Sequence, residues 1–149
     1  MTNFQYWPIF YANSMVLIPT SVKTTAGVRR SIDPMQVVNV ENTLELKRAI
    51  LATIAKGNPI VPHPSQEEMS KPTNIHKKLG FKSYKAFNHT AIAWNLDLDD
   101  GIYEIEFTKM TEDSRGHESD TSKTITFPSG TPVETVVDRL IEIIQETHK

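Results

Sequence analysis

Three acidic residues, Asp97, Glu104 and Glu106, have types and spacing that could support chemistry. Hard divalent cations bind carboxylate oxygens, so the three could form a metal site if they share one face of a sheet. A pair of acids could also carry out hydrolysis, provided that one of them lies in a cleft with a raised pKa. The same side chains could instead contact lysine or arginine side chains of a protein partner.

The wider segment 97–120 concentrates acidic charge. It holds nine acidic residues against two basic ones, which is half of the 18 acids in a chain whose formal charge is −2. Like charges that face each other across strands lower stability, and a chain that tolerates them is typical of one that meets a cationic partner. A plain solvated face is the alternative interpretation. We predict a partner-binding surface made of Asp97, Asp99, Glu104, Glu106, Glu112, Asp113 and Glu118.

The other residues with chemical potential form no recognised motif. The chain has five histidines, whose spacings match no metal-binding pattern, and it has no cysteine. Ser83 and Ser129 lie outside the G-x-S-x-G pattern of serine hydrolases. We therefore predict no enzymatic activity, no catalytic residue, no metal and no cofactor. A small carboxylate- or metal-dependent hydrolase that uses the same acids remains the alternative.

The acids are expected to lie on a β-hairpin around the turn Asp100-Gly101, a strong two-residue turn signal. A two-residue loop pairs positions whose numbers sum to 201, so Asp97 faces Glu104 and Asn95 faces Glu106. A slip by one residue would turn apolar groups into water. We expect the acidic face to be solvated. The opposite face is apolar and consists of Trp94, Leu96, Leu98, Tyr103, Ile105 and Phe107.

Further elements are expected on both sides of this hairpin. Strands are expected near 14–21, 35–40 and 121–127, with Pro19 ending the first and residues 110–120 forming a polar loop. Asn42 is expected to cap a helix that stops at Gly57, and Ser83 a short one. Thr131 is expected to cap a C-terminal amphipathic helix. The pattern predicts a single α+β domain over residues 1–149, with a mainly antiparallel sheet and helices packed on one face.

Composition narrows the class of protein. The chain has 149 residues, 38% of them hydrophobic and 23% charged, which is typical of a globular domain. No apolar run approaches the roughly 20 residues of a membrane helix, and the first residues do not read as a signal peptide. We expect a cytoplasmic protein that binds neither membrane nor nucleic acid. The lysines of segment 77–85, which surround Phe81 and Tyr84, leave an RNA-binding module as a third possibility.

Several short motifs follow one another between residues 15 and 145. The most specific is Gly80-Phe81-Lys82-Ser83, directly followed by an aromatic residue. The others are Val16-Leu17-Ile18-Pro19, Ala26-Gly27, Asp33-Pro34, the helix Leu44 to Ala55, Val61-Pro62-His63-Pro64, the sheet strands and the capped C-terminal helix. In this order they resemble the immunity proteins of bacterial contact-dependent growth inhibition (CDI) systems.

The resemblance implies a non-enzymatic protein of the producing cell's cytoplasm. Such a protein binds the C-terminal toxin domain of a large secreted effector, as a one-to-one heterodimer, and blocks its active site. Toxins of this kind are frequently nucleases, whose basic clefts hold phosphate groups. An acidic inhibitor surface suits such a partner. The resemblance supplies no contact residues, so the predicted interface depends on the charge pattern.

Overall fold

The structure is a computed structural model that describes residues 4–70, 75–110 and 117–149. Its strands are β1 (Phe4–Ala12), β2 (Met15–Thr24), β3 (Arg29–Asn39), β4 (Ile60–Val61), β5 (Ile92–Asp99), β6 (Ile102–Met110) and β7 (His117–Thr126). Its helices are α1 (Thr43–Ala55), α2 (Gln66–Ser70), α3 (Ile75–Lys78), α4 (Tyr84–Thr90) and α5 (Val133–His148). None of these helices is long and apolar enough to span a membrane.

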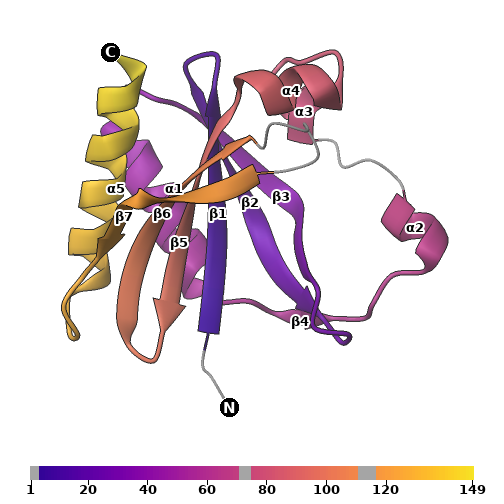
Figure 1. Cartoon of the computed structure of the whole chain (residues 1–149), viewed down its shortest axis with the longest axis horizontal. Helices are drawn as coiled ribbons and strands as arrows, with labels where there is room; N and C mark the ends of the chain where they lie inside the picture. Colours follow the sequence, from indigo (N-terminus) through magenta and orange to yellow (C-terminus); the bar gives the residue numbers. More distant parts are fainter. Residues whose placement is uncertain (1–3, 71–74, 111–116) are drawn as a thin grey trace.

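The described strands form one sheet in the order β3-β2-β1-β5-β6-β7, with β4 beside β2 (Figure 1). Neighbouring strands are antiparallel except β2 and β4. The N-terminal strand β1 is an inner strand, which pairs with β5 along most of its length but with β2 only at Phe10 to Ala12. This arrangement confirms the predicted α+β class with a mainly antiparallel sheet.

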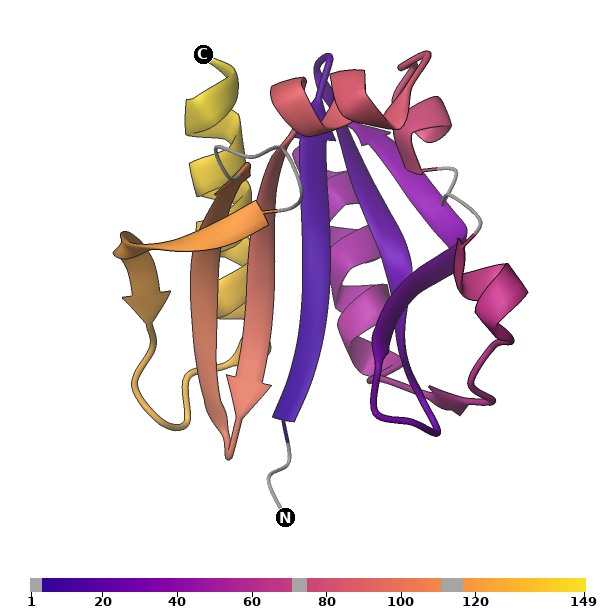
Figure 2. The same cartoon turned by 45° about the vertical axis from the view of Figure 1, so that its right-hand side comes forward.

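Helices α1 and α5 lie on one face of the sheet (Figure 2). Side chains alternate between the two faces of a strand, so Trp7, Trp94 and Leu96 all point toward these helices and are buried. The apolar stripe predicted for the C-terminal helix completes this core, and each buried side chain contributes about 1.5–3 kcal/mol. The buried residues of α5 are Val136, Val137, Leu140, Ile141 and Ile144.

A smaller apolar cluster packs on the opposite face, at one end of the sheet. Leu17 points away from its neighbours Val16 and Ile18 and joins Leu79 and Phe87, so α3 and α4 cover this end. In the part of the chain that the structure describes, no helix covers the other end of this face (Figure 2). The uncovered end carries the acidic residues of the hairpin.

The Asn58 side chain joins β1 to β2 in the region where the backbones of the two strands are not paired with each other. The Tyr6 N–H donates to its Oδ1 at 2.8 Å, and its Nδ2 donates to the carbonyls of Tyr6 at 3.0 Å and Ser21 at 3.3 Å. The Ser21 hydroxyl also donates to the Tyr6 carbonyl, at 2.8 Å. A single side chain thus replaces part of the backbone ladder and fixes the position of Tyr6.

Replacing Asn58 with alanine is expected to lower the free energy of unfolding by about 2 kcal/mol, because part-buried backbone groups would lose their hydrogen bonds. Denaturant unfolding measures this change. The control Asn39→Ala removes one exposed hydrogen bond from the Glu41 N–H, of 2.9 Å, and is expected to have less than half of that effect. Equal losses in the two variants would contradict the bridging role of Asn58.

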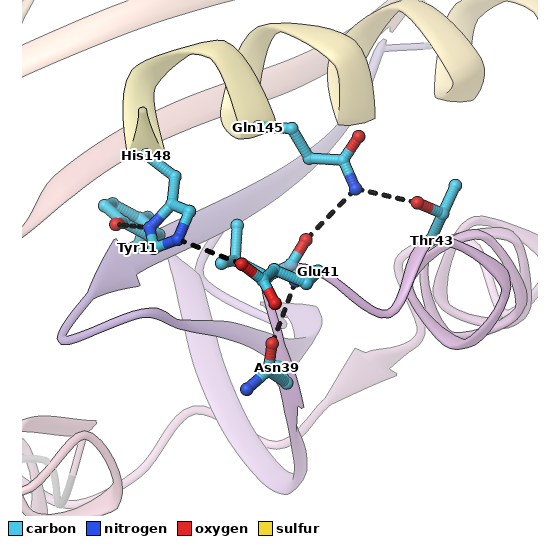
Figure 3. Close-up of polar contacts among 7 residues, drawn as sticks. Tyr11, Asn39, Glu41, Thr43, Gln145 and His148 are labelled. Carbon is cyan, nitrogen blue, oxygen red and sulfur yellow. Dashed lines mark hydrogen bonds and ion pairs between the residues drawn. The ribbon is translucent and has the colours of Figure 1, made fainter.

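The C-terminal end of α5 is hydrogen-bonded to strand β1 and to the start of α1 (Figure 3). The Tyr11 hydroxyl and Nδ1 of His148 share a hydrogen bond of 2.7 Å, which joins α5 to β1. Nε2 of Gln145 donates to the Val40 carbonyl at 3.1 Å and to the Thr43 hydroxyl at 2.8 Å. These contacts fix α5 against the start of α1.

Two predicted helix caps are confirmed. The Glu45 N–H donates to the Asn42 side chain at 3.2 Å, and the Ala86 N–H donates to the Ser83 hydroxyl at 3.1 Å. The Thr131 cap is wrong, because α5 begins after Pro132 without a side-chain cap. The Thr131 hydroxyl instead donates to the Pro128 carbonyl of the preceding turn at 2.6 Å.

Two predicted strand boundaries are also wrong. Strand β2 continues past Pro19 to Thr24, and a register shift between Ile18 and Thr20 accommodates the proline, which has no N–H to donate. Strand β7 begins at His117, inside the segment expected to be a polar loop. A shift in its register against β6 accompanies a sharp bend in β7 (Figure 2).

Candidate partner-binding site

The hairpin has the register predicted from the sequence. Asp97 pairs with Glu104 and Asn95 pairs with Glu106, while the apolar residues between them turn to the core. Positive φ angles at Asp100 (51°) and Gly101 (81°) form the tight turn, as a two-residue hairpin loop requires. The strand geometry therefore brings all of these polar side chains to the uncovered face.

These side chains line a cleft of about 480 Å³ on that face. Strands β5 and β6 supply its acidic side, and strands β1 and β3 supply residues from distant parts of the sequence. The cleft therefore combines four strands rather than the hairpin alone. The residues that line it are Phe4, Tyr6, Arg29, Asn95, Asp97, Asp99, Ile102, Glu104 and Glu106.

Asp97 is buried at the base of the cleft, with only 6% of its surface exposed. Its Oδ1 atom is enclosed and has no hydrogen-bond partner among the residues that the structure describes. The expectation that the acidic face is simply solvated is therefore wrong for Asp97. The physical reason is that β5 is an inner strand, because the sheet continues through β1, whose Tyr6 lies opposite Asp97 in the ladder.

The environment of Asp97 opposes ionisation and raises the pKa of its carboxyl to about 7. Burial is the main cause, followed by the charges of Glu106 and Glu104 and by a hydrogen bond with Glu106. The charge of Arg29 acts in the opposite direction but is the weakest influence. A proton on Asp97 lets its carboxyl share a hydrogen bond with Glu106, which two ionised carboxylates could not do.

Aromatic rings form the second side of the cleft. The guanidinium carbon of Arg29 lies 4.5 Å from the centre of the Phe4 ring and 4.6 Å from that of Tyr6. Burial raises the pKa of the Tyr6 hydroxyl, and the negative charge of Asp97 adds to this effect. The cleft therefore places a cation-binding aromatic wall beside a cluster of carboxylates.

The arrangement is suited to binding a cation. One carboxylate oxygen from each of Asp97, Glu104 and Glu106 lies within 4.8 Å of the other two. Glu104 is also held in place, because the Thr126 hydroxyl donates to its carboxylate at 3.0 Å. Among the described residues that line the cleft, the groups that could act as a nucleophile are the carboxylates and the Tyr6 hydroxyl.

The seven predicted interface residues do not all meet at this cleft. Asp97, Asp99, Glu104 and Glu106 line it, with Asp99 exposed at its rim. Glu118 lies on β7 opposite Lys109, toward the other end of β6. Glu112 and Asp113 lie outside the residues that the structure describes.

The sequence prediction missed the wall of the cleft that Phe4, Tyr6 and Arg29 form. Phe4 and Tyr6 do alternate with Gln5 and Trp7, as in a strand with two different faces, so a strand signal was present. No local pattern indicated that this strand pairs with β5.

Comparisons with known proteins show a similar fold without similarity in sequence. No family model matches the chain, and no curated protein matches its sequence. A protein of unknown function, NMB0488 from Neisseria meningitidis, shares the fold with a TM-score of 0.67 at 12% identity, over 98% of this chain and 95% of that one. A chain of the CdiA-CT/CdiI toxin and immunity complex from Yersinia pseudotuberculosis has a TM-score of 0.61 at 10% identity, over 95% and 97%.

Proposed function

We propose that this protein is a non-enzymatic CDI immunity protein, which binds the toxin domain of a cognate effector and blocks its activity. It acts in the cytoplasm as one partner of a one-to-one complex. The acidic cleft and its rim form the part of the interface that attracts the toxin. A nuclease is the class of toxin that suits this surface best, because nucleases hold phosphate groups in basic clefts.

The observation that carries the proposal is the partly buried acidic cleft between β5, β6 and β1. Ionisation of the buried Asp97 carboxyl lowers the stability of the free protein, which is typical of a group kept for binding rather than for folding. The order of the sequence motifs supports an immunity protein independently. The shared fold with a chain of a toxin and immunity complex, over nearly the whole of both chains, is consistent with it.

The test is a binding measurement with the candidate toxin domain, which an upstream reading frame for a very long secreted protein would supply. We expect Asp97→Asn combined with Glu104→Lys and Glu106→Lys to slow association by about 10- to 100-fold at low salt, and to flatten its dependence on salt. Asp97 is neutralised rather than reversed, because a buried lysine could prevent folding. Stopped-flow fluorescence measures both quantities.

A matched control changes the net charge by the same amount on the other side of the molecule. Glu134→Lys, Asp138→Asn and Glu142→Lys alter exposed positions of α5. This control is expected to change the association rate by less than about threefold. If both triple variants associate at the same rate, the cleft is not the interface; if the wild-type protein does not bind the toxin domain, the proposed function is wrong.

A further inference from the structure

The base of the cleft holds an atom whose capacity for hydrogen bonding is unused. Oδ1 of Asp97 is enclosed and lacks a partner in the described part of the chain, and the whole residue is only 6% exposed. A buried polar atom without a partner is unfavourable, and more so when it is charged. A ligand that donates a hydrogen bond to this oxygen would remove that penalty. The atom therefore points to an occupant that carries N–H groups.

The aromatic wall shows which kind of N–H group fits. Arg29 already places its guanidinium within 4.6 Å of the ring centres of both Phe4 and Tyr6. A guanidinium group is planar, so its faces pack on rings while its edges donate hydrogen bonds to carboxylates. Arg29 shows that these two rings pack against a guanidinium group, and the carboxylates that line the same cleft are acceptors for such a group. Its acidic residues outnumber Arg29 four to one, so negative charge remains for a second cation.

We propose that the cleft is a receptor for the side chain of a single arginine of the partner protein. The guanidinium of this arginine donates hydrogen bonds to Asp97 at the base and to Glu104 or Glu106 beside it, and its aliphatic stem lies along Ile102 at the rim. The inference rests on the proposed function, which supplies the partner as a protein.

A metal ion fits the cleft less well than a guanidinium group. Calcium takes six to eight oxygen ligands and magnesium demands an octahedron of them. Here the cluster has three carboxylates, and the other residues that line the cleft include the aromatic Phe4 and Tyr6 and the cation Arg29, none of which is a ligand for these metals. A lysine ammonium could pair with the acids, but it cannot donate two parallel hydrogen bonds to one carboxylate as a guanidinium does.

The direct test is a titration of the purified chain with methylguanidinium chloride, followed by NMR of the side-chain carboxyl carbons at constant ionic strength. We expect saturable shifts at Asp97, with a Kd in the millimolar range typical of so small a ligand. Methylammonium, magnesium and calcium chloride are expected to bind about tenfold more weakly. Absence of a saturable shift with methylguanidinium, or tighter binding of either metal, would overturn the proposal.

Two variants with the same change in charge make the test specific to the base of the cleft. Asp97→Asn is expected to weaken methylguanidinium binding about tenfold, which corresponds to about 1.4 kcal/mol. Asp138→Asn, on the exposed side of α5, is expected to leave the Kd within about twofold of the wild-type value. Equal Kd values for the two variants would refute the role of Asp97.

The titration requires no toxin, so its result is independent of the proposed function. A chain that binds a toxin domain but not methylguanidinium would disprove the arginine receptor and leave the immunity function standing. A chain that binds methylguanidinium but no candidate toxin would support the receptor and disprove the proposed function.

Discussion

Replacing Asp97 with asparagine is expected to stabilise the isolated protein near pH 8 by about 2 to 4 kcal/mol, a rise in melting temperature of about 5 to 15 °C. The carboxyl of Asp97 has a pKa of about 7 in the folded protein, against about 4 in an unfolded chain. Between these values the unfolded state loses the proton that the folded state keeps. Ionisation of Asp97 therefore destabilises the fold progressively as the pH rises from about 4 to about 7.

The difference between variant and wild type should follow the same course. It should be small near pH 4, where both forms are uncharged at this position, and should reach its full size above pH 7. Thermal unfolding across this pH range measures it. The control Asp99→Asn changes an exposed residue of the same strand and should shift the melting temperature little at any pH. A stabilisation by Asp97→Asn that is constant with pH would exclude the buried carboxyl as its cause.

Replacing Leu140 with alanine is expected to lower the free energy of unfolding by about 2 to 5 kcal/mol, the largest loss predicted for this chain. Leu140 is fully buried where α5 packs on the sheet, so the truncated side chain would leave a cavity in the main core. The core residues behind the hairpin, Trp94 and Ile105, belong to the same cluster. Urea unfolding at equilibrium gives the change directly.

The chain offers a matched control for the same substitution. Leu44 lies on α1 and is 80% exposed, so Leu44→Ala removes the same atoms from the surface and is expected to change stability by less than about 0.5 kcal/mol. Similar losses for both variants would mean that helix propensity rather than burial determines the effect. Such a result would also contradict the packing of α5 on the sheet.

The hairpin could be predicted in detail because its determinants are local. The turn Asp100-Gly101 sets the loop, and the alternation on each side leaves one register that buries Trp94 and Phe107 together. The helix caps at Asn42 and Ser83 depend on the next three residues only, and both were predicted correctly. Local determinants were therefore sufficient for the hairpin and for these two caps, although the equally local prediction of a cap at Thr131 was wrong.

The cleft could not be predicted, because it depends on contacts between distant parts of the chain. The burial of Asp97 follows from its pairing with Tyr6 across β1 and β5, and no residue near Asp97 indicates that partner. Arg29 reaches the same place from β3. The hairpin alone therefore looks like a solvated acidic face. The change in pKa, and with it the chemistry of the site, arises only when the whole sheet has formed.

The inner position of β1 also matters during synthesis of the chain. Strand β1 is made before the other strands of the sheet, but more than half of the sequence separates it from β5, with which it pairs from Phe4 to Tyr11. Pairings between such distant segments form slowly, because the intervening chain loses much conformational freedom. In a nascent chain β1 can therefore pair only with β2, at Phe10 to Ala12, until β5 has emerged. The sheet and its acidic cleft consequently appear together, late in translation, and an incomplete chain that stops before β5 has no cleft at all.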